Sequence, residues 1–426
     1  MTKQTAIHAR LTAPPSKSLT QRAVAAALLS QGESRIVAPS YSDDARVAVA
    51  MAKKWGATVL EREQAWHIIP AAAPTTTALA LHCRESALCA RLFAPLATVF
   101  YPSVKITGSG TLRKRPMDGL ADALAAFGVD ASLRHGRLPL QTTGLLSPGT
   151  AVLDASGSSQ TLSGMLMALP LLNGNSELTV RRLVSRPYAA MTIEVMQAFG
   201  IRIVHENEDR FFIPGGQRYT PQTYSIEGDW SSAAYWLVVG AIGGSVTIDG
   251  LHADSRQADK AIIEALRLAG AELQWDGAAL IVRRRALKAF RFDATDCPDL
   301  FPPLAVLAAF CDGRSVLEGA DRLLHKESNR VEALRETLGR LGVSVTPGRN
   351  CLTVEGKVQR GGRLSSFHDH RIAMAAACAG LFAPTPVYVG NMRCIRKSYP
   401  AFTRDLALVA GKKKNDSRTF LFNPVS

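Results

Sequence analysis

An internal repeat of about seventy residues is the feature of this sequence that most constrains its fold. After five of the repeated glycines, apolar and polar residues alternate, as in a strand. Glycine just beyond the last turn of a helix permits the left-handed conformation that ends many helices. Each repeat is therefore predicted to hold an amphipathic helix, a glycine and a strand, with the strand missing from the sixth. The six glycines, spaced 69 to 72 residues apart, are Gly56, Gly128, Gly200, Gly270, Gly342 and Gly411.

A second helix is predicted in each repeat, and it is apolar around most of its surface. Such a helix belongs inside a core. Three repeats would allow three of these helices to bury one another, with strands and amphipathic helices outside. Two domains of three repeats account for nearly the whole chain. The six apolar stretches begin at Lys17, Glu85, Ser158, Trp230, Pro298 and His368.

The N-terminal ends of these apolar stretches carry polar residues, namely Lys, Ser, Thr, Gln, Asp and Arg. Free backbone N–H groups and the helix dipole favour anions at a helix N-terminus. A serine or aspartate there is most simply an N-cap, but capping does not require lysine or arginine. If the buried helices run in the same direction, their N-termini share one surface of each domain. Two such surfaces facing each other would form a positive cleft.

Composition limits the class of protein. Hydrophobic residues make up 47% of the chain, which excludes a disordered or fibrous protein. No apolar run reaches about 18 residues, so no transmembrane helix is expected. The first ten residues, MTKQTAIHAR, lack the apolar region of a secretory signal, and the seven cysteines include no CxxC pair. We therefore expect a cytoplasmic protein whose cysteines are free thiols.

The net charge of +14 favours anionic partners, which include nucleic acids, phosphorylated metabolites and acidic proteins. The only dense basic cluster is Lys412–Lys414, in a polar tail, where a charge run is usually solvated. Aromatic residues form only 7% of the chain and do not alternate with basic ones as in proteins that stack bases. Small anionic metabolites are therefore favoured over nucleic acid.

Several short segments carry groups suited to an anionic, hydroxylated ligand. Lys17, Ser18 and Arg22 begin the first apolar helix, and Ser18 and Arg22 are four residues apart on one face. Arg115 belongs to an RKRP segment that precedes an amphipathic helix. Taken singly, each segment could equally be a cap or a solvated surface. Hydroxyl and amide groups come from Ser158, Ser159, Gln160, Ser185 and Tyr188.

A second set lies in the C-terminal half. Residues 325–330 are predicted to begin a helix, in which Lys326 and Arg330 would flank Glu327 and hold an anion while Glu327 moves protons. A surface helix with salt bridges explains this segment equally well. His368 and His370 could suggest a metal, but two histidines without a third ligand nearby are weak evidence. We interpret Arg371 and Lys397 as anion contacts.

These segments, in this order, resemble the enolpyruvyl transferase family, and in particular its 5-enolpyruvylshikimate-3-phosphate synthases. The resemblance runs through SKSLTQR, RKRP, SSQ, SRPY, EGDWSSA, HKESNR, HDHR and RKSYP, which extend from residue 14 to residue 400. It implies an α/β fold, a two-domain inside-out α/β barrel with six βαβαββ repeats, three per domain, around buried parallel helices. The implied domains are 1–11 with 228–426, and 12–227, with the active site in the interdomain cleft.

The resemblance also implies a reaction, in which the enolpyruvyl group of phosphoenolpyruvate passes to the 5-hydroxyl of shikimate 3-phosphate and phosphate is released. Both substrates are anions, and no metal or organic cofactor, nucleic acid or membrane is implied; a monomer is expected. The implied phosphoenolpyruvate ligands are Lys17, Ala87, Arg115, Gln160, Arg330, Arg371 and Lys397. The implied shikimate 3-phosphate ligands are Lys17, Ser18, Arg22, Ser158, Ser159, Gln160, Ser185, Tyr188, Asp299 and Lys326.

The implied catalytic residues are Asp299, which would take the hydroxyl proton, and Glu327 and Lys397. The last two would exchange protons with the methylene carbon and the leaving phosphate of a tetrahedral intermediate. The chain departs from the family pattern at Glu85, Ala87, Leu324, Asn329 and His368. Ala87 replaces a glycine, and its methyl group would narrow the space beside phosphoenolpyruvate. We therefore expect reduced sensitivity to glyphosate, which occupies that space in the family.

Two other interpretations of the function remain. Within the family, a UDP-N-acetylglucosamine enolpyruvyl transferase would carry a Lys-Asn pair where this chain has Lys17 and Ser18, and usually a cysteine acid. Cys89 lies in an apolar helix and is a poor acid. From another class, a repeat protein that binds RNA ends or acidic partners would also explain the positive charge, and steep salt dependence of RNA binding would identify it.

Overall fold

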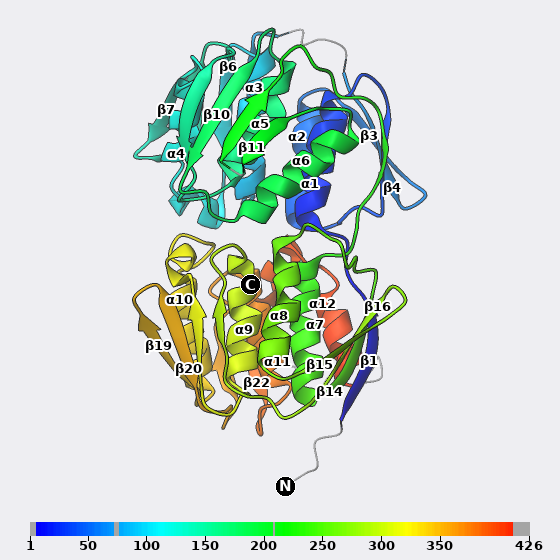
Figure 1. The fold of residues 1–426 in the computed structure, drawn as a ribbon, viewed down its shortest axis with the longest axis vertical. Coiled ribbons are helices and arrows are strands. Elements are labelled where there is room, and N and C mark those ends of the chain that lie inside the picture. Colours follow the sequence, from blue (N-terminus) through cyan, green and yellow to red (C-terminus); the bar gives the residue numbers. More distant parts are fainter. Residues whose placement is uncertain (1–5, 72–75, 208, 412–426) are drawn as a thin grey trace. The chain divides into compact units, whose positions relative to one another are not determined.

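The computed structural model describes residues 6–71, 76–207 and 209–411 (Figure 1). The chain divides into two compact units. Residues 15–227 form what we call the continuous unit, and residues 1–14 with 228–426 form the discontinuous unit. The basic cluster Lys412–Lys414 lies outside the described residues. Among the helices that are described, none is long and apolar enough to cross a membrane.

In its described residues the continuous unit contains three four-stranded sheets, each with one parallel pair of strands followed by two antiparallel neighbours. The repeat that is continuous in sequence from residue 78 shows the pattern, with the sheet order β5-β6-β8-β7. Its elements are β5 (Ala78–His82), α3 (Ala87–Phe100), β6 (Ser103–Thr107), α4 (Asp118–Ala125), β7 (Asp130–Arg134) and β8 (Arg137–Thr143). The next repeat comprises β9 (Thr150–Asp154), α5 (Gln160–Ala168), β10 (Ser176–Arg181), α6 (Arg186–Ala198), β11 (Val204–Asn207) and β12 (Arg210–Ile213).

The first sheet of the continuous unit is completed from the far end of its segment. Strand β13 (Thr223–Ser225) pairs in parallel with β2, in the order β13-β2-β4-β3. The other elements of this repeat are α1 (Lys17–Leu29), β2 (Ser34–Val37), α2 (Asp43–Lys54), β3 (Thr58–Arg62) and β4 (Ala65–Ile69).

The discontinuous unit repeats the same plan. Strand β1 (Ile7–Thr12) pairs in parallel with β14, so the start of the chain completes a sheet of residues 244–283. That repeat continues with α7 (Trp230–Gly243), β14 (Gly244–Asp249), α8 (Ile262–Leu268), β15 (Glu272–Asp276) and β16 (Ala279–Arg283). The next comprises β17 (Arg291–Asp293), α9 (Phe301–Ala308), β18 (Arg314–Glu318), α10 (Arg330–Arg340), β19 (Ser344–Gly348) and β20 (Cys351–Glu355). The last comprises β21 (Gly362–Leu364), α11 (His370–Gly380), β22 (Val387–Val389) and α12 (Phe402–Val409).

The repeated glycines end helices as predicted. All six have a positive φ, between 69° and 111°, and follow α2, α4, α6, α8, α10 and α12. Strands then begin two residues after Gly56, Gly128, Gly270 and Gly342. After Gly200 the strand begins at Val204, two residues later than in the other repeats.

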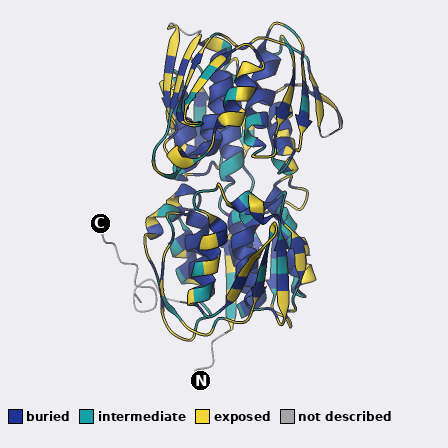
Figure 2. Cartoon of the chain, turned by 90° about the vertical axis from the view of Figure 1, so that its left-hand side faces the viewer, coloured by how far each residue is buried: buried dark blue, intermediate teal, exposed yellow. Residues whose placement is uncertain are grey.

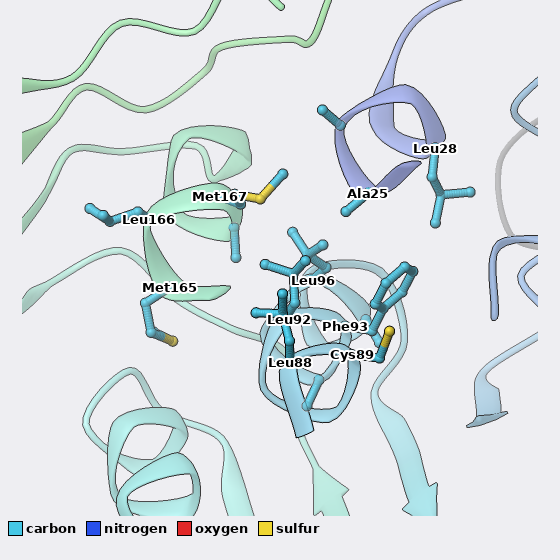
Figure 3. Packing of buried hydrophobic residues seen from close by; sticks show 14 of the residues in the cluster. Ala25, Leu28, Leu88, Cys89, Leu92, Phe93, Leu96, Met165, Leu166 and Met167 are labelled. Carbon is cyan, nitrogen blue, oxygen red and sulfur yellow. The ribbon is translucent and has the colours of Figure 1, made fainter. Parts of the chain in front are cut away.

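The apolar helices form the core of each unit, as the sequence predicts. In the continuous unit α3 packs against both α1 and α5, and nearly every residue of α3 is buried. Figure 2 shows the inner helices mostly in the colour of buried residues. Ala25, Leu96 and Met167 are among the side chains that point into the space between these helices (Figure 3). In the discontinuous unit α7, α9 and α11 contact one another and are buried in the same way. The sheets lie outside the helices, which makes an inside-out α/β fold; within the described residues the sheets of a unit stay separate rather than closing into one barrel.

Strand direction fixes where the core helices begin. Helices α3, α5, α9 and α11 each connect two parallel strands of one sheet. Each of these helices therefore begins at the sheet edge where the preceding strand ends. Polar side chains at their N-termini are thus brought to one end of each unit.

Candidate active site

The discontinuous unit gathers charged side chains from four segments around Arg330. We call this group the Arg330 cluster. Arg330 is the first residue of α10 and is buried, with 1% of its side chain exposed. Its guanidinium contacts three carboxylates, each at 2.8 Å: Nη1 donates to Asp299, Nη2 to Glu327 and Nε to Asp369. The members of the cluster are Asp299, Lys326, Glu327, Arg330, Asp369, Arg371 and Lys397.

Asp299 lies at the centre of this positive charge. It belongs to a 3-10 turn, Pro298–Leu300, and accepts a second hydrogen bond from Arg371 Nη2 at 2.7 Å. Lys326 Nζ is 3.9 Å from its Oδ1. Burial alone would raise the pKa of Asp299, but the charges of Arg371, Lys326 and Arg330 outweigh burial and hold that pKa well below its ordinary value. In this state the carboxylate is a weak base.

Glu327, which accepts from Arg330 Nη2, is also a neighbour of Lys397. Lys397 is the last residue of a 3-10 turn, Met392–Lys397, and its Nζ lies 3.7 Å from Glu327 Oε1. Both side chains are nearly buried. The sequence prediction that a helix begins near residue 325 is wrong, because α10 begins only at Arg330. Asn329 caps it by accepting a hydrogen bond from the Glu332 N–H, so residues 326–328 form a turn that directs Lys326 and Glu327 toward Asp299 and Arg330.

Two carboxylates of this region escaped the sequence analysis. Asp369, within a segment first considered for metal binding, is instead the N-cap of α11 and accepts from the Arg371 N–H at 2.9 Å. Asp259, in a 3-10 turn of residues 258–261, is buried and accepts a hydrogen bond from the Ser231 hydroxyl. Burial, reinforced by the negative charge of Asp299, raises the pKa of Asp259 to about 7.

In the continuous unit, Arg22 is a fully buried cation at the start of a core helix. It donates to the hydroxyls of Thr192 (2.8 Å) and Ser163 (3.3 Å) and to the carbonyls of Ser18 (3.0 Å) and Tyr188 (3.3 Å). Burial lowers its pKa to about 10. The same end of the unit holds Lys17, whose Nζ is 3.1 Å from Asp44 Oδ2.

A second buried arginine of this unit, Arg91 in α3, was also missed by the sequence analysis. It donates from Nη1 to Gln160 Oε1 at 3.1 Å and from Nη2 to the carbonyl of Pro116 at 2.8 Å. These two contacts join α3 to the start of α5 and to the segment that carries Arg115. Burial, and after it the charge of Arg115, lowers the pKa of Arg91 to about 9. The available signal was an arginine within an otherwise apolar stretch.

The remaining residues expected from the resemblance also lie at helix starts in the continuous unit. Ser159 is buried at the N-cap position of α5, and Ser158 Oγ accepts from the Gln160 N–H at 3.2 Å. Ser185 precedes α6 in the left-handed conformation, with φ of 56°, and Tyr188 lies in the first turn of that helix. Arg115 directly follows the 3-10 turn Gly110–Lys114.

Two departures from the family pattern, Glu85 and Asn329, accept hydrogen bonds that fix the local backbone. Glu85 Oε1 accepts a hydrogen bond from the Thr111 N–H at 2.9 Å and so fixes the turn that leads to Arg115. Ala87 is the first residue of α3, is buried, and follows the N-cap Ser86. Cys89 is buried in the same helix, and burial raises its pKa to about 12, so the thiol stays protonated and is a poor candidate for the cysteine acid of a UDP-N-acetylglucosamine enolpyruvyl transferase. Leu324 is partly exposed, with 43% of its surface accessible.

Each unit thus presents buried cations at the N-termini of core helices. The Arg330 cluster adds carboxylates that can accept or donate protons, and the continuous unit adds hydroxyl and amide groups. Within the described residues no group of three or more histidine, cysteine or acidic side chains is arranged to hold a metal ion. This set can bind anions of small hydroxylated molecules and perform acid–base chemistry on them.

Comparison of this chain with known proteins identifies the family to which it belongs. Residues 1–406 match the family model described as EPSP synthase (3-phosphoshikimate 1-carboxyvinyltransferase). The chain belongs to the EPSP synthase family. Curated 3-phosphoshikimate 1-carboxyvinyltransferases are similar along almost their whole length. That of Thermococcus kodakarensis is 38% identical over 404 residues, covering 94% of this chain and 97% of the relative. That of Clostridium botulinum strain Alaska E43 is 35% identical over 407 residues, covering 93% and 94%.

Solved structures show the same fold for this EPSP synthase family member. EPSP synthase from Acinetobacter baumannii superposes with a TM-score of 0.78 at 26% identity, covering 95% of this chain and 96% of that one. The enolpyruvyl transferase NikO from Streptomyces tendae has a TM-score of 0.75 at 17% identity, covering 95% of each chain, a likeness that shows the fold alone. The inside-out two-domain α/β fold implied by the family resemblance, with the buried helices predicted from the repeats, is confirmed. Neither alternative reading, the UDP-N-acetylglucosamine enzyme or an RNA-binding repeat protein, is favoured.

Proposed function

We propose that the protein transfers the enolpyruvyl group of phosphoenolpyruvate to the 5-hydroxyl of shikimate 3-phosphate and releases phosphate, by addition and elimination through a tetrahedral intermediate. Membership of the EPSP synthase family supports the reaction. The structural observation that carries it is the double hydrogen bonding of Asp299 by Arg330 and Arg371. A carboxylate base is thereby held beside two cations that can bind an anionic substrate.

Substrate binding would activate Asp299. Arg330 and Arg371 now donate to it and hold its pKa low. When a substrate anion accepts hydrogen bonds from these arginines, their hold on Asp299 weakens and its basicity rises. Asp299 then takes the proton of the 5-hydroxyl while the hydroxyl oxygen bonds to C2 of phosphoenolpyruvate. The base thus becomes strong only when a substrate is present.

Glu327 and Lys397 act on the other atoms of the intermediate. As C2 is attacked, C3 receives a proton; in the second step C3 loses a proton and the C2–O bond to phosphate breaks. The separation of 3.7 Å between Glu327 Oε1 and Lys397 Nζ allows one group to serve the carbon and the other the leaving phosphate. Positive charge in both units offsets the repulsion between the two anionic substrates.

The binding residues divide between the two units, which we propose act on the same pair of substrates in one active site. In the continuous unit, Lys17, Ala87, Arg115 and Gln160 contact phosphoenolpyruvate. In the discontinuous unit, Arg330, Arg371 and Lys397 do so. Shikimate 3-phosphate is held by Lys17, Ser18, Arg22, Ser158, Ser159, Gln160, Ser185, Tyr188, Asp299 and Lys326.

The decisive experiment is a phosphate-release assay on the purified full chain. Phosphate should appear when phosphoenolpyruvate and shikimate 3-phosphate are both present, and not with either alone. Release with UDP-N-acetylglucosamine in place of shikimate 3-phosphate would contradict the proposed acceptor. No release with any acceptor, together with steeply salt-dependent binding to unrelated RNA, would support the nucleic-acid alternative instead.

We further propose a cytoplasmic monomer that requires no metal or organic cofactor. The seven cysteines are all free thiols, which supports a reducing compartment. The proposed reaction is a group transfer without change of oxidation state, and its proton transfers can be made by side chains alone. Light scattering of the purified chain and assay in the presence of a chelator would test these two points.

A further inference from the structure

We propose that Arg91 is a positioning residue for phosphoenolpyruvate, because it fixes the side-chain amide of Gln160 with its N–H donors turned toward the substrate. This inference rests on the proposed function and adds a residue that neither the motifs nor the family resemblance assigned. Arg91 lies four residues after Ala87 in α3, so both occupy one side of that helix.

Arg91 resembles Arg22 of the same unit, because both are buried cations that donate to neutral oxygens. Only 7% of Arg91 is exposed, yet among the described residues no carboxylate pairs with it. Its hydrogen-bond acceptors are the neutral oxygens of Gln160 and Pro116. An uncompensated buried charge is costly, and a purely structural link between these oxygens could be made by neutral donors. The positive charge of the Arg91 guanidinium therefore indicates that a bound anion lies nearby when the substrate is present.

The geometry determines which way the Gln160 amide faces. A guanidinium offers only donors, so the amide must turn its oxygen toward Arg91 and its NH₂ group away. Within the described residues Gln160 Nε2 has no acceptor, which leaves both of its hydrogens for a ligand. Without Arg91 the amide could rotate and present its oxygen, which repels an anion. The second contact holds the carbonyl of Pro116, directly after Arg115, so one guanidinium orders two of the proposed ligands.

A glycine makes this contact possible. The Cβ of any larger residue at Gly164 would lie 2.2 Å from the Arg91 carbonyl oxygen, so α5 and α3 touch backbone to backbone there. Gln160 is four residues before Gly164 and lies on the same face of α5. The close approach of the helices therefore brings the Gln160 amide within reach of the Arg91 side chain.

The test is a double-mutant cycle with Arg91→Met and Gln160→Ala, assayed by phosphate release. Arg91→Met should raise the KM for phosphoenolpyruvate at least about tenfold, equivalent to ~1.4 kcal/mol, and leave the KM for shikimate 3-phosphate within about twofold. In the Gln160→Ala background the same change should have a much smaller effect, since the amide it positions is gone. Equal effects in both backgrounds, or an equal rise in both KM values, would overturn the inference.

Two further variants cover the case in which Arg91→Met fails to fold. Arg91→Lys keeps the charge but lacks the planar fork that reaches both acceptors, so its KM for phosphoenolpyruvate should be intermediate. Gln160→Glu should raise the melting temperature by pairing with Arg91, yet raise the KM for phosphoenolpyruvate by removing the donor. Wild-type values for either variant refute the positioning role. An inactive wild type refutes the proposed function instead.

Discussion

Arg330 and Asp369 form an ion pair in the interior of the discontinuous unit, with Nε and Oδ2 2.8 Å apart and no more than 1% of either side chain exposed. The same carboxylate accepts the N–H of Arg371 and so caps α11. One aspartate therefore holds the guanidinium of Arg330 and the backbone N–H of Arg371, and the side chains of both arginines contact Asp299. A buried charge that loses its partner destabilises a protein far more than the intact pair stabilises it.

Asp369→Asn should lower the free energy of unfolding by about 1–3 kcal/mol, because Arg330 Nε loses its charged acceptor while Asp299 and Glu327 still pair with the rest of the guanidinium. Asp249→Asn is the matched control, because its partner Arg10 is 68% exposed and water replaces the lost contact. Urea unfolding of both variants measures the difference. Similar losses in the two variants would show that burial does not set the strength of the Arg330 pair.

Glu327→Gln and Lys397→Met should each reduce kcat by about 10²-fold or more, since each removes a group that transfers protons. Both should still fold, which thermal unfolding will show. Phosphate release under saturating substrates measures the effect. Full turnover by Lys397→Met would mean that this lysine is not a catalytic residue.

Ala87→Gly should increase sensitivity to glyphosate by roughly ten- to a hundredfold, the range expected for one methylene-sized group in a binding pocket. Ala87 is buried at the first position of α3, where the methyl group would narrow the space for the inhibitor. Inhibition curves for the wild type and the variant provide the measurement. If glyphosate inhibits both equally and tightly, the methyl group does not limit access.

Asp259 should make stability depend on pH. Its pKa of about 7 in the folded protein lies above the ordinary value of 3.8, so the folded state keeps a proton that the unfolded state releases. The contribution of protonated Asp259 to the free energy of unfolding is fully present below about pH 4 and is lost as the pH rises through 7. Asp259→Asn should therefore gain stability relative to the wild type between pH 4.5 and pH 8 in urea unfolding. A difference that stays constant with pH would contradict this.

Gly164→Ala should push α3 and α5 apart and destabilise the fold by about 1–3 kcal/mol, the usual cost of overpacking. Gly149→Ala is the control, since a Cβ there meets nothing within 4 Å. The same substitution should also raise the KM for phosphoenolpyruvate, because the Arg91–Gln160 contact depends on the close approach. A Gly164 variant as stable as the control would argue against a rigid helix contact.

Much of the fold could be predicted from local patterns. The glycines at 56, 128, 200, 270 and 342 end helices and precede strands because the C-cap conformation and strand alternation are properties of a few neighbouring residues. The apolar helices are recognisable because a helix with no polar face can only be buried. The start of α10 was misplaced because Asn329 was read as part of a helix rather than as its cap.

The candidate site was less predictable, because its pairs join segments far apart in sequence. Asp369 lies between the two histidines considered for a metal, yet its partner Arg330 is 39 residues away. Arg91 meets Gln160 across 69 residues, and only the helix contact at Gly164 reveals it. Asp259 acquires its raised pKa from burial, which no local motif records.

The pairing of β1 with β14 has a consequence for biosynthesis. Arg10 and Asp249, which join the two strands, are 239 residues apart. At a translation rate of about 5–20 residues per second, β1 leaves the ribosome tens of seconds or so before its neighbour exists. The continuous unit, whose closing strand β13 precedes that point, is by then fully synthesised. During this interval the backbone N–H and C=O groups of β1 in the nascent chain lack their partner strand, and chaperones are suited to shield such an exposed strand edge.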